Sequence, residues 1–212
     1  MKSILPGLLL AICSLPAWAD PPQTRGAAPP DSPGTAGLLE LQPAGQSLAA
    51  TYYAPIQNQR DIDVMTLDLS RAWRLETAFE LQERFTVFRA HGSRTDAPFG
   101  TDPDSAATGF AVGPALRLYF LDFLDTGRAR PFVEGSAQFL FTPGTAGGFP
   151  AGGSGVNGFL RAGAGVLLRL RPRLAIEATY QWYSHVSNAA GASPQNPMWN
   201  GRGGSIALRQ EF

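Results

Sequence analysis

The stretch FELQERFTV, residues 79–87, decides the fold because its polar and apolar side chains alternate along almost its whole length. One face of an extended chain would carry the large apolar side chains: Phe79, Leu81, Phe85 and Val87. The other face would carry polar ones: Glu80, Gln82, Arg84 and Thr86. An alternation with period two is typical of a strand with two unlike faces and not of a helix.

The stretch PFVEGSAQFLF, residues 131–141, alternates in the same way. Its apolar positions are Val133, Ala137, Phe139 and Phe141, and its polar positions are Glu134, Ser136 and Gln138. Segments of this kind recur along the chain, and we count eight: about 45–54, 61–71, 76–90, 107–121, 129–142, 157–170, 174–188 and 200–212. The sequence therefore predicts an all-β fold with an even number of strands.

The connections between these segments alternate in length. RLE, DFLDTGR and RPR are tight, whereas the connections near 55–60, 91–106, 143–156 and 189–199 are mostly longer and rich in Gly, Pro, Asp and Ser. Outer-membrane barrels have short periplasmic turns and longer outer loops. No segment after the N-terminal stretch approaches the roughly 18 consecutive apolar residues of a membrane helix. We predict an eight-stranded antiparallel transmembrane β-barrel, since closure leaves no unpaired strand edge in lipid.

Both ends of the sequence agree with this prediction. MKSILPGLLLAICSLPAWAD has the layout of a secretory signal cleaved after Ala19. We expect a signal peptide over 1–19, a flexible Pro/Gly-rich leader over 20–44 and the barrel over 45–212. The final strand, SIALRQEF, ends in Phe212, which resembles the C-terminal aromatic signature of outer-membrane barrels. The expected location is the cell outer membrane.

A soluble lipocalin-like barrel or a sandwich would share this strand count and period. The membrane is favoured by aromatic residues near strand ends, which suit two interfacial girdles. These residues are Tyr52, Tyr53, Trp73, Tyr119, Trp182 and Trp199.

The composition argues against several functions. The 17 basic and 17 acidic residues balance, so the sequence lacks the excess of positive charge that is typical of proteins that bind nucleic acid or anionic membrane surfaces. Cys13, the single cysteine, lies within the expected signal peptide, which leaves neither disulfides nor a thiol nucleophile after cleavage. With two histidines and scattered carboxylates, a dedicated zinc site is not expected.

One of the two histidines, His185, is followed two residues later by Ser187 near the outer end of the seventh strand. Residues two apart on a strand share a face and stand roughly 6.6 Å apart. Serine needs an adjacent base to act as a nucleophile at neutral pH, so the pair could begin acyl transfer. As a bare pattern His-x-Ser arises often by chance, and a polar strand end is the plainer interpretation.

HVSNA at 185–189, followed by NPMWN at 196–200, resembles the motif of the lipid A 3-O-deacylases, the PagL-type outer-membrane esterases. RPFVEGSAQFLF and FLRAGAGVLLRL are similar to two strands that precede that motif in the family. The resemblance covers residues 129–200. It implies an eight-stranded barrel that hydrolyses the ester at position 3 of lipid A at its lipid-facing outer surface, with lipopolysaccharide as substrate and without a metal or other cofactor.

Carried over by position, the resemblance makes Ser187 the nucleophile and His185 the general base. Asn188 and Asn196 become candidates for oxyanion support, because amide donors can stabilise the developing negative charge. At Asn200 the family pattern has a glutamate that orients the histidine. An asparagine there can still accept a hydrogen bond from the imidazole, but it supplies no negative charge. The resemblance therefore implies a working but slow enzyme.

The facing of the pair is an open question at the level of the sequence. His185 and Ser187 share parity with residues that look luminal: Glu177, Thr179, Gln181 and Tyr183. Asn200 instead shares parity with Ile206, Leu208 and Phe212, so we expect it to face lipid. Either a bulge in the seventh strand flips the later side chains, or the pair faces the lumen.

Further alternatives stay open. His91, with Arg89 and Arg94, lies at the outer end of the third strand, where basic groups could meet lipid A phosphates, although a solvated rim is the plainer interpretation. The rival functions are a non-catalytic structural or adhesive OmpX-like barrel and a phospholipase-type esterase acting on other outer-membrane lipids. The sequence leaves open whether the barrel forms a homodimer.

Overall fold

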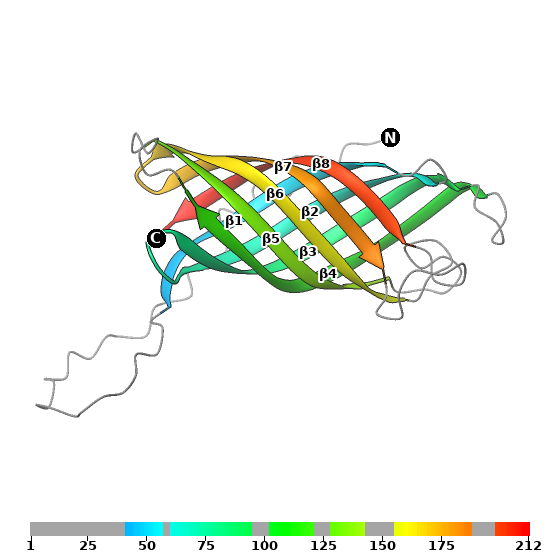
Figure 1. Cartoon of the computed structure of the whole chain (residues 1–212), viewed down its shortest axis with the longest axis horizontal. Coiled ribbons are helices and arrows are strands. Elements are labelled where there is room, and N and C mark those ends of the chain that lie inside the picture. Colours follow the sequence, from blue (N-terminus) through cyan, green and yellow to red (C-terminus); the bar gives the residue numbers. More distant parts are fainter. Residues whose placement is uncertain (1–40, 57–59, 95–101, 121–127, 143–154, 188–197) are drawn as a thin grey trace, which may run out of the picture. The chain divides into compact units, whose positions relative to one another are not determined.

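A computed structural model of the chain describes residues 41–56, 60–94, 102–120, 128–142, 155–187 and 198–212. These residues form eight strands: β1 (Gln42–Pro55), β2 (Arg60–Arg74), β3 (Phe79–Arg94), β4 (Asp102–Tyr119), β5 (Ala129–Phe141), β6 (Val156–Arg171), β7 (Leu174–Ser187) and β8 (Trp199–Glu211). Each strand pairs antiparallel with its sequence neighbours, and β8 pairs with β1 to close the barrel (Figure 1). The predicted eight-stranded antiparallel barrel is confirmed.

The strand boundaries differ from the expected ones mainly in one hairpin. β3 ends at Arg94 and β4 begins at Asp102, so this hairpin extends beyond the segments 76–90 and 107–121. β1 begins at Gln42, three residues before the expected start at residue 45. The expected signal peptide and nearly all of the expected leader lie outside the described residues.

The two ends of the barrel differ in their connections. At one end, β6 and β7 are joined through Pro172 and Arg173, and the backbone N–H of Glu211 donates to the carbonyl of Arg173. We call this end the turn end, and we call the opposite end, where β7 finishes at Ser187 and β8 begins at Trp199, the loop end. In outer-membrane barrels the short turns face the periplasm, which places the loop end at the cell exterior.

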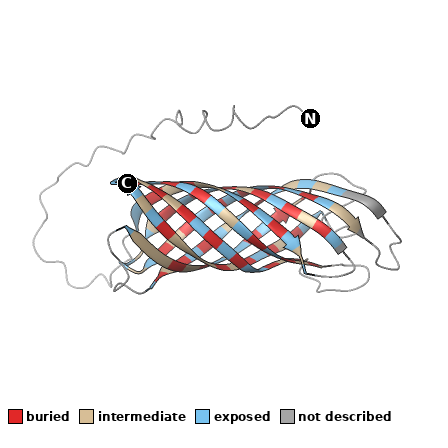
Figure 2. Cartoon of the chain, turned by 90° about the horizontal axis from the view of Figure 1, so that it is seen from above, coloured by how far each residue is buried: buried red, intermediate tan, exposed pale blue. Residues whose placement is uncertain are grey.

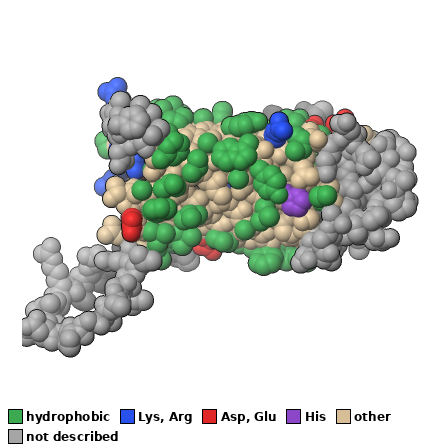
Figure 3. Space-filling model, in the orientation of Figure 1, with side chains coloured by type: hydrophobic (Ala, Val, Ile, Leu, Met, Phe, Trp, Pro, Cys, Tyr) green, Lys and Arg blue, Asp and Glu red, His purple; other side chains and the backbone are tan. Residues whose placement is uncertain are grey.

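The alternation seen in the sequence becomes an alternation between lumen and outer surface, as Figure 2 shows by the chequered burial of the strands. On β3, Glu80, Gln82 and Arg84 are buried inside, whereas Phe85 and Val87 are exposed outside. Figure 3 shows hydrophobic side chains spread over the outer face of the strands. An apolar exterior around a charged interior is the reverse of a soluble barrel, so the soluble alternative is wrong.

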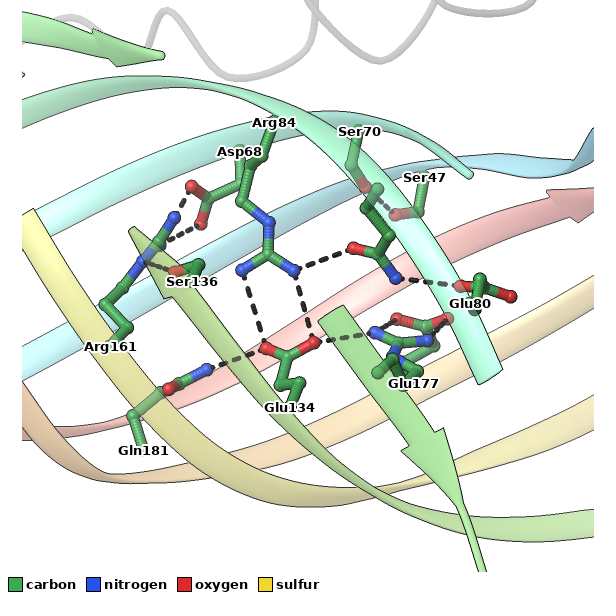
Figure 4. Close-up of polar contacts among 12 residues, drawn as sticks. Ser47, Asp68, Ser70, Glu80, Arg84, Glu134, Ser136, Arg161, Glu177 and Gln181 are labelled. Carbon is green, nitrogen blue, oxygen red and sulfur yellow. Dashed lines mark hydrogen bonds and ion pairs between the residues drawn. The ribbon is translucent and has the colours of Figure 1, made fainter. Parts of the chain in front are cut away.

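Charged side chains fill the middle of the lumen and pair with one another (Figure 4). The ion pairs, with N–O distances between 2.6 and 3.3 Å, are Arg161–Asp68, Arg84–Glu134, Arg117–Glu134, Arg117–Glu177, Arg209–Glu80 and Arg209–Glu177. Gln181 on β7 also donates to Glu134, at 3.0 Å. These contacts join strands on opposite sides of the barrel and occupy its interior with protein groups.

Toward the loop end, the lumen becomes apolar. A buried cluster there contains four large aromatic residues: Tyr53, Phe88, Phe159 and Trp199. Tyr53, Trp199 and also Tyr119 were expected in interfacial girdles, and for these three the expectation is wrong because their strand positions point inward. Tyr52 and Trp182 do face outward, exposed by 46% and 44%.

Within the described residues, no helix is long and apolar enough to cross a membrane. The same residues contain no group of three or more His, Cys, Asp or Glu side chains placed to hold a metal ion.

Candidate active site at the loop end

A β-bulge near the end of β7 determines which way His185 and Ser187 point. On the β6 side, Tyr183 pairs with Ala162 and Gln181 pairs with Gly163, so Trp182 is an extra residue. The pairing with β8 breaks over the same interval, between Gln181 and Ser184. Trp182 and Tyr183 are consecutive, yet both are exposed, by 44% and 42%. One extra residue reverses the facing of every later side chain.

The residues after the bulge confirm this reversal. Ser184 and Val186 are buried in the lumen, and Val186 belongs to the apolar cluster at the loop end. His185 and Ser187 are half-buried and lie on the outer face. Of the two alternatives that the sequence left open, the bulge is the one that the structure contains.

His185 is joined to a residue on each side of its ring. Its Nε2 lies 2.9 Å from Ser187 Oγ, and its Nδ1 lies 2.6 Å from Asn200 Oδ1. Asn200 is directly opposite His185 in the β7–β8 pairing, and it is half-buried on the outer face, as its parity predicted. The three side chains therefore form one hydrogen-bonded row at the outer surface.

The chemistry of the Asn200 amide determines which atom donates and which accepts in these two hydrogen bonds. An amide oxygen can only accept, so Nδ1 of His185 carries the proton and donates it to Asn200. In the neutral imidazole, Nε2 is then the free acceptor, and the Ser187 hydroxyl donates to it. That is the tautomer in which a histidine can remove the proton of a serine nucleophile.

Neighbouring groups hold the row in place. The ring of Tyr183 stacks on that of His185, with centroids 6.0 Å apart and planes 15° apart. At the start of β8, the indole of buried Trp199 donates to the carbonyl of Ile62 at 2.9 Å. The carbonyl of Asn200 also accepts a hydrogen bond from the backbone N–H of Ile56 at 3.1 Å. Asn200 is therefore anchored by its own backbone and by its neighbour.

The remaining predicted residues are not part of this row. Asn188 and Asn196 lie outside the described residues. His91 and Arg89 are exposed on the outer face of β3, where His91 pairs with Asp63, and β1 and β2 separate them from β8. Arg94 is the last residue of β3, and its side chain is not among those that the structure describes.

Sequence reasoning missed two outward-facing residues beside the row, Tyr183 and Arg202. Tyr183 was assigned to the luminal face because the bulge has no clear signal in the sequence. Arg202 lies two residues after Asn200 and is exposed on the same face of β8. The parity that placed Asn200 toward lipid would also have found Arg202.

Three solved outer-membrane barrels share this architecture. The outer membrane enzyme PagL is 19% identical with a TM-score of 0.50, covering 76% of this chain and 97% of PagL. OprG from Pseudomonas aeruginosa is 12% identical with a TM-score of 0.51, covering 81% and 97%. Neisserial surface protein A is 13% identical with a TM-score of 0.50, covering 80% and 96%. At these identities the likeness establishes the fold, and it confirms the prediction of an outer-membrane type of barrel.

No protein-family model matches the chain, and no curated protein matches its sequence.

Proposed function

We propose that this protein is an outer-membrane esterase that removes the 3-linked acyl chain of lipid A by serine–histidine catalysis. The observation that carries the proposal is the row Asn200–His185–Ser187, hydrogen-bonded at 2.6 and 2.9 Å on the outer surface of the barrel. A bulge is needed to bring His185 and Ser187 to that surface, and bulges are over-represented beside active sites. A plain polar strand end would need neither the bulge nor the ordered row.

The depth of the row suits an ester bond of a membrane lipid. Gly204 on β8 is flanked by Tyr180 and Tyr52, which pair with it from either side and are exposed by 55% and 46%. Exposed tyrosines of this kind mark the interface between the hydrocarbon core and the headgroups. Asn200 lies four residues nearer the loop end, about 13 Å along the strand. We therefore propose that the row lies near headgroup level, where acyl chains join the sugar of lipid A.

The proposed reaction proceeds in two halves. Ser187 Oγ attacks the ester carbonyl carbon while its proton passes to Nε2 of His185. When the tetrahedral intermediate collapses, the bond between the carbonyl carbon and the sugar oxygen breaks, and Nε2 returns the proton to that oxygen. Water then attacks the acyl-serine with the same histidine as base, which releases the fatty acid and restores Ser187. Asn188 and Asn196 are proposed to donate to the oxyanion.

Asn200 is proposed to act as a positioning residue. By accepting the Nδ1 proton it keeps Nε2 as the basic nitrogen, although it supplies no charge to stabilise the imidazolium that forms. PagL, one of the structural neighbours, is itself an outer membrane enzyme, which is consistent with catalysis on this type of barrel.

The test is incubation of the purified, folded protein with lipopolysaccharide and separately with phospholipids, followed by mass spectrometry of the products. We expect loss of one 3-linked acyl chain from lipid A. Ser187→Ala and His185→Ala should each abolish this loss, because base and nucleophile act as a unit. Cleavage of phospholipid alone would make the protein a phospholipase, and an absence of cleavage would favour a structural or adhesive barrel.

The chain contains its own matched control. Its other histidine, His91, is also followed two residues later by a serine, Ser93. Both lie near the loop end of β3. His91→Ala and Ser93→Ala should leave deacylation within about twofold of the parent. Equal losses in the two His-x-Ser pairs would contradict the assignment of catalysis to β7.

A further inference from the structure

Arg202 is an isolated cation on the lipid-facing surface beside the candidate site. It lies on the outer face of β8, pairs with Ala54 of β1 on one side, and is opposite the bulge residues Trp182 and Tyr183 on the other. Its side chain is exposed, and within the described part of the chain it makes no hydrogen bond or ion pair. The luminal arginines, in contrast, are buried against carboxylates: Arg84, Arg117, Arg161 and Arg209.

The surroundings of Arg202 give its depth in the membrane. Two residues nearer the turn end, Gly204 lies between the exposed side chains of Tyr180 and Tyr52. The next outward-facing side chains along β8 are the exposed Ile206 and Leu208. A charged side chain on the lipid face of a barrel is costly at the bilayer centre and nearly free of cost at the interface. Arg202 therefore lies toward the loop-end margin of the apolar surface, opposite the exposed aromatic side chains of Trp182 and Tyr183 and away from the bilayer centre.

The distance from Arg202 to the row suits one lipid headgroup. Arg202 and Asn200 are two residues apart on the same face, on the order of 7 Å along the strand. The flexible arginine side chain could reach an anionic group that lies within about one sugar ring of the ester held at Ser187. A guanidinium binds phosphate through two parallel N–H donors, which fixes orientation as well as affinity.

We propose that Arg202 binds a phosphate of the lipid substrate and thereby holds the scissile ester over Ser187. The proposal rests on the proposed function for the identity of the reaction, and it specifies the substrate as a phosphorylated lipid. Two lipids of the outer membrane could supply the phosphate: the phosphorylated sugar of lipid A and a phospholipid headgroup. We favour lipid A, because its phosphates are carried on the same sugars as the ester-linked chains.

Binding can be measured apart from catalysis in Ser187→Ala protein. In detergent micelles, the titration with lipid A, dephosphorylated lipid A or phosphatidylglycerol would be followed by the fluorescence of Trp182, which lies opposite Arg202 on β7. A Trp73→Phe background removes the emission of the other tryptophan on the outer face, which is half-buried. Adding Arg202→Gln should weaken binding of lipid A by roughly tenfold or more, as expected for loss of a charge-assisted contact. Binding of dephosphorylated lipid A should be weak and unchanged. Arg202→Lys should bind lipid A with an intermediate affinity, because lysine supplies a positive charge without the two parallel N–H donors of the guanidinium.

Arg89 gives the matched control, since it is also exposed on the outer face but lies on β3. Arg89→Gln should change lipid A binding by less than about twofold. The proposal would be overturned by an equal loss in Arg89→Gln, by a loss that persists with dephosphorylated lipid A, or by a loss confined to phosphatidylglycerol.

Activity separates this inference from the proposed function. In the enzyme with Ser187 intact, Arg202→Gln should raise KM for lipopolysaccharide by roughly tenfold with kcat changed by less than about threefold. If the parent cleaves no ester, the proposed function fails, whereas phosphate-dependent binding in Ser187→Ala protein would still support the role of Arg202. If the parent is active and Arg202→Gln leaves both KM and binding unchanged, the inference about Arg202 alone fails.

Discussion

Asn200 lies directly opposite His185 across the β7–β8 pairing, with its amide oxygen 2.6 Å from the histidine Nδ1. An amide at this place performs the geometric part of an acid's role, because it fixes the tautomer and the ring orientation. It leaves the electrostatic part unfilled, since the partners of the His185 ring in the described part of the chain are the uncharged Asn200 and Ser187. Within the described residues, the nearest acids on these strands are luminal Glu177 on β7 and Glu211 at the turn end of β8.

Asn200→Asp should therefore raise the deacylation rate, because it replaces the amide oxygen with a charged acceptor of the same length. An increase of about tenfold is expected if the charge-assisted hydrogen bond is roughly twice as strong as the neutral one. Asn200→Glu should raise the rate less, since an extra methylene must fit into a 2.6 Å contact. Asn200→Ala should lower it. The measurement is the initial rate on purified lipopolysaccharide, and three variants equal to the parent would show that Asn200 does not support His185.

The luminal ion pairs predict the response of the barrel to heat. Arg161 donates to both carboxylate oxygens of Asp68, at 2.9 and 3.0 Å, and both side chains are buried. Arg161→Met should cost about 3–5 kcal/mol, because it leaves a buried carboxylate without its cation. Arg161→Met combined with Asp68→Leu should cost less than the single change. Arg71 is exposed and lies over the Trp73 ring. Arg71→Met should lower the free energy of unfolding by about 1 kcal/mol or less.

This order can be measured on gels, since a folded barrel in detergent migrates faster unheated than after boiling. The temperature at which the fast band disappears should fall most in Arg161→Met, recover in the double variant and barely move in Arg71→Met. A single band with no shift on heating would contradict the closed barrel itself.

The facing of the tryptophans can be tested by quenching their fluorescence with brominated lipids. Trp182 is exposed on the outer face, whereas Trp199 is fully buried in the lumen. Because Trp73 is half-buried on the outer face at the turn end, the comparison is made in a Trp73→Phe background. There, Trp182→Phe should remove most of the quenchable emission, and Trp199→Phe should raise the quenchable fraction of what is left. The opposite pattern would mean that the facing of β7 or β8 is reversed.

Period-two alternation predicted the strands, because a strand with one lipid face and one polar luminal face must alternate. The alternating lengths of the connections and the terminal Phe212 were needed to prefer a membrane barrel to a soluble barrel or a sandwich. On β3 and β5 the predicted faces agree residue by residue, from Glu80 and Arg84 inside to Phe139 outside. The aromatic girdles were only half right. Tyr53 and Trp199 lie near strand ends as expected, but their side chains are buried in the apolar cluster that fills the lumen at the loop end.

The candidate site shows the limit of the same reasoning. The motif pointed to His185, Ser187 and Asn200, and the parity of β8 placed Asn200 correctly. Parity along β7 left the face of His185 open between a bulge and the lumen, because a bulge depends on how three strands share hydrogen bonds and not on the composition of one strand. The consecutive aromatics Trp182 and Tyr183 mark the place, yet two adjacent aromatics alone do not predict a bulge.

Gly201 gives the sharpest test of whether the start of β8 positions the site. A Cβ added at Gly201 would lie 2.2 Å from Cη2 of Trp199 and 3.0 Å from the carbonyl oxygen of Ala54. The Trp199 ring cannot easily yield, because it is buried against Tyr53 with ring centroids 6.2 Å apart and is hydrogen-bonded to the carbonyl of Ile62. Gly201→Ala must therefore displace the strand that carries Asn200, its immediate neighbour.

Gly204→Ala is the matched control on the same strand. The nearest atom to an added Cβ there is the carbonyl oxygen of Thr179, at 4.0 Å, which is an ordinary contact. We expect Gly201→Ala to lower kcat by roughly 10–100-fold, since a displacement of about 1 Å can cost a hundredfold in rate. We also expect it to lower stability by about 1–3 kcal/mol, as overpacking does. Gly204→Ala should stay within about twofold of the parent in rate. If Gly201→Ala loses stability but keeps full activity, the position of Asn200 does not limit catalysis, because the His185–Asn200 hydrogen bond would then tolerate movement of the strand that bears it.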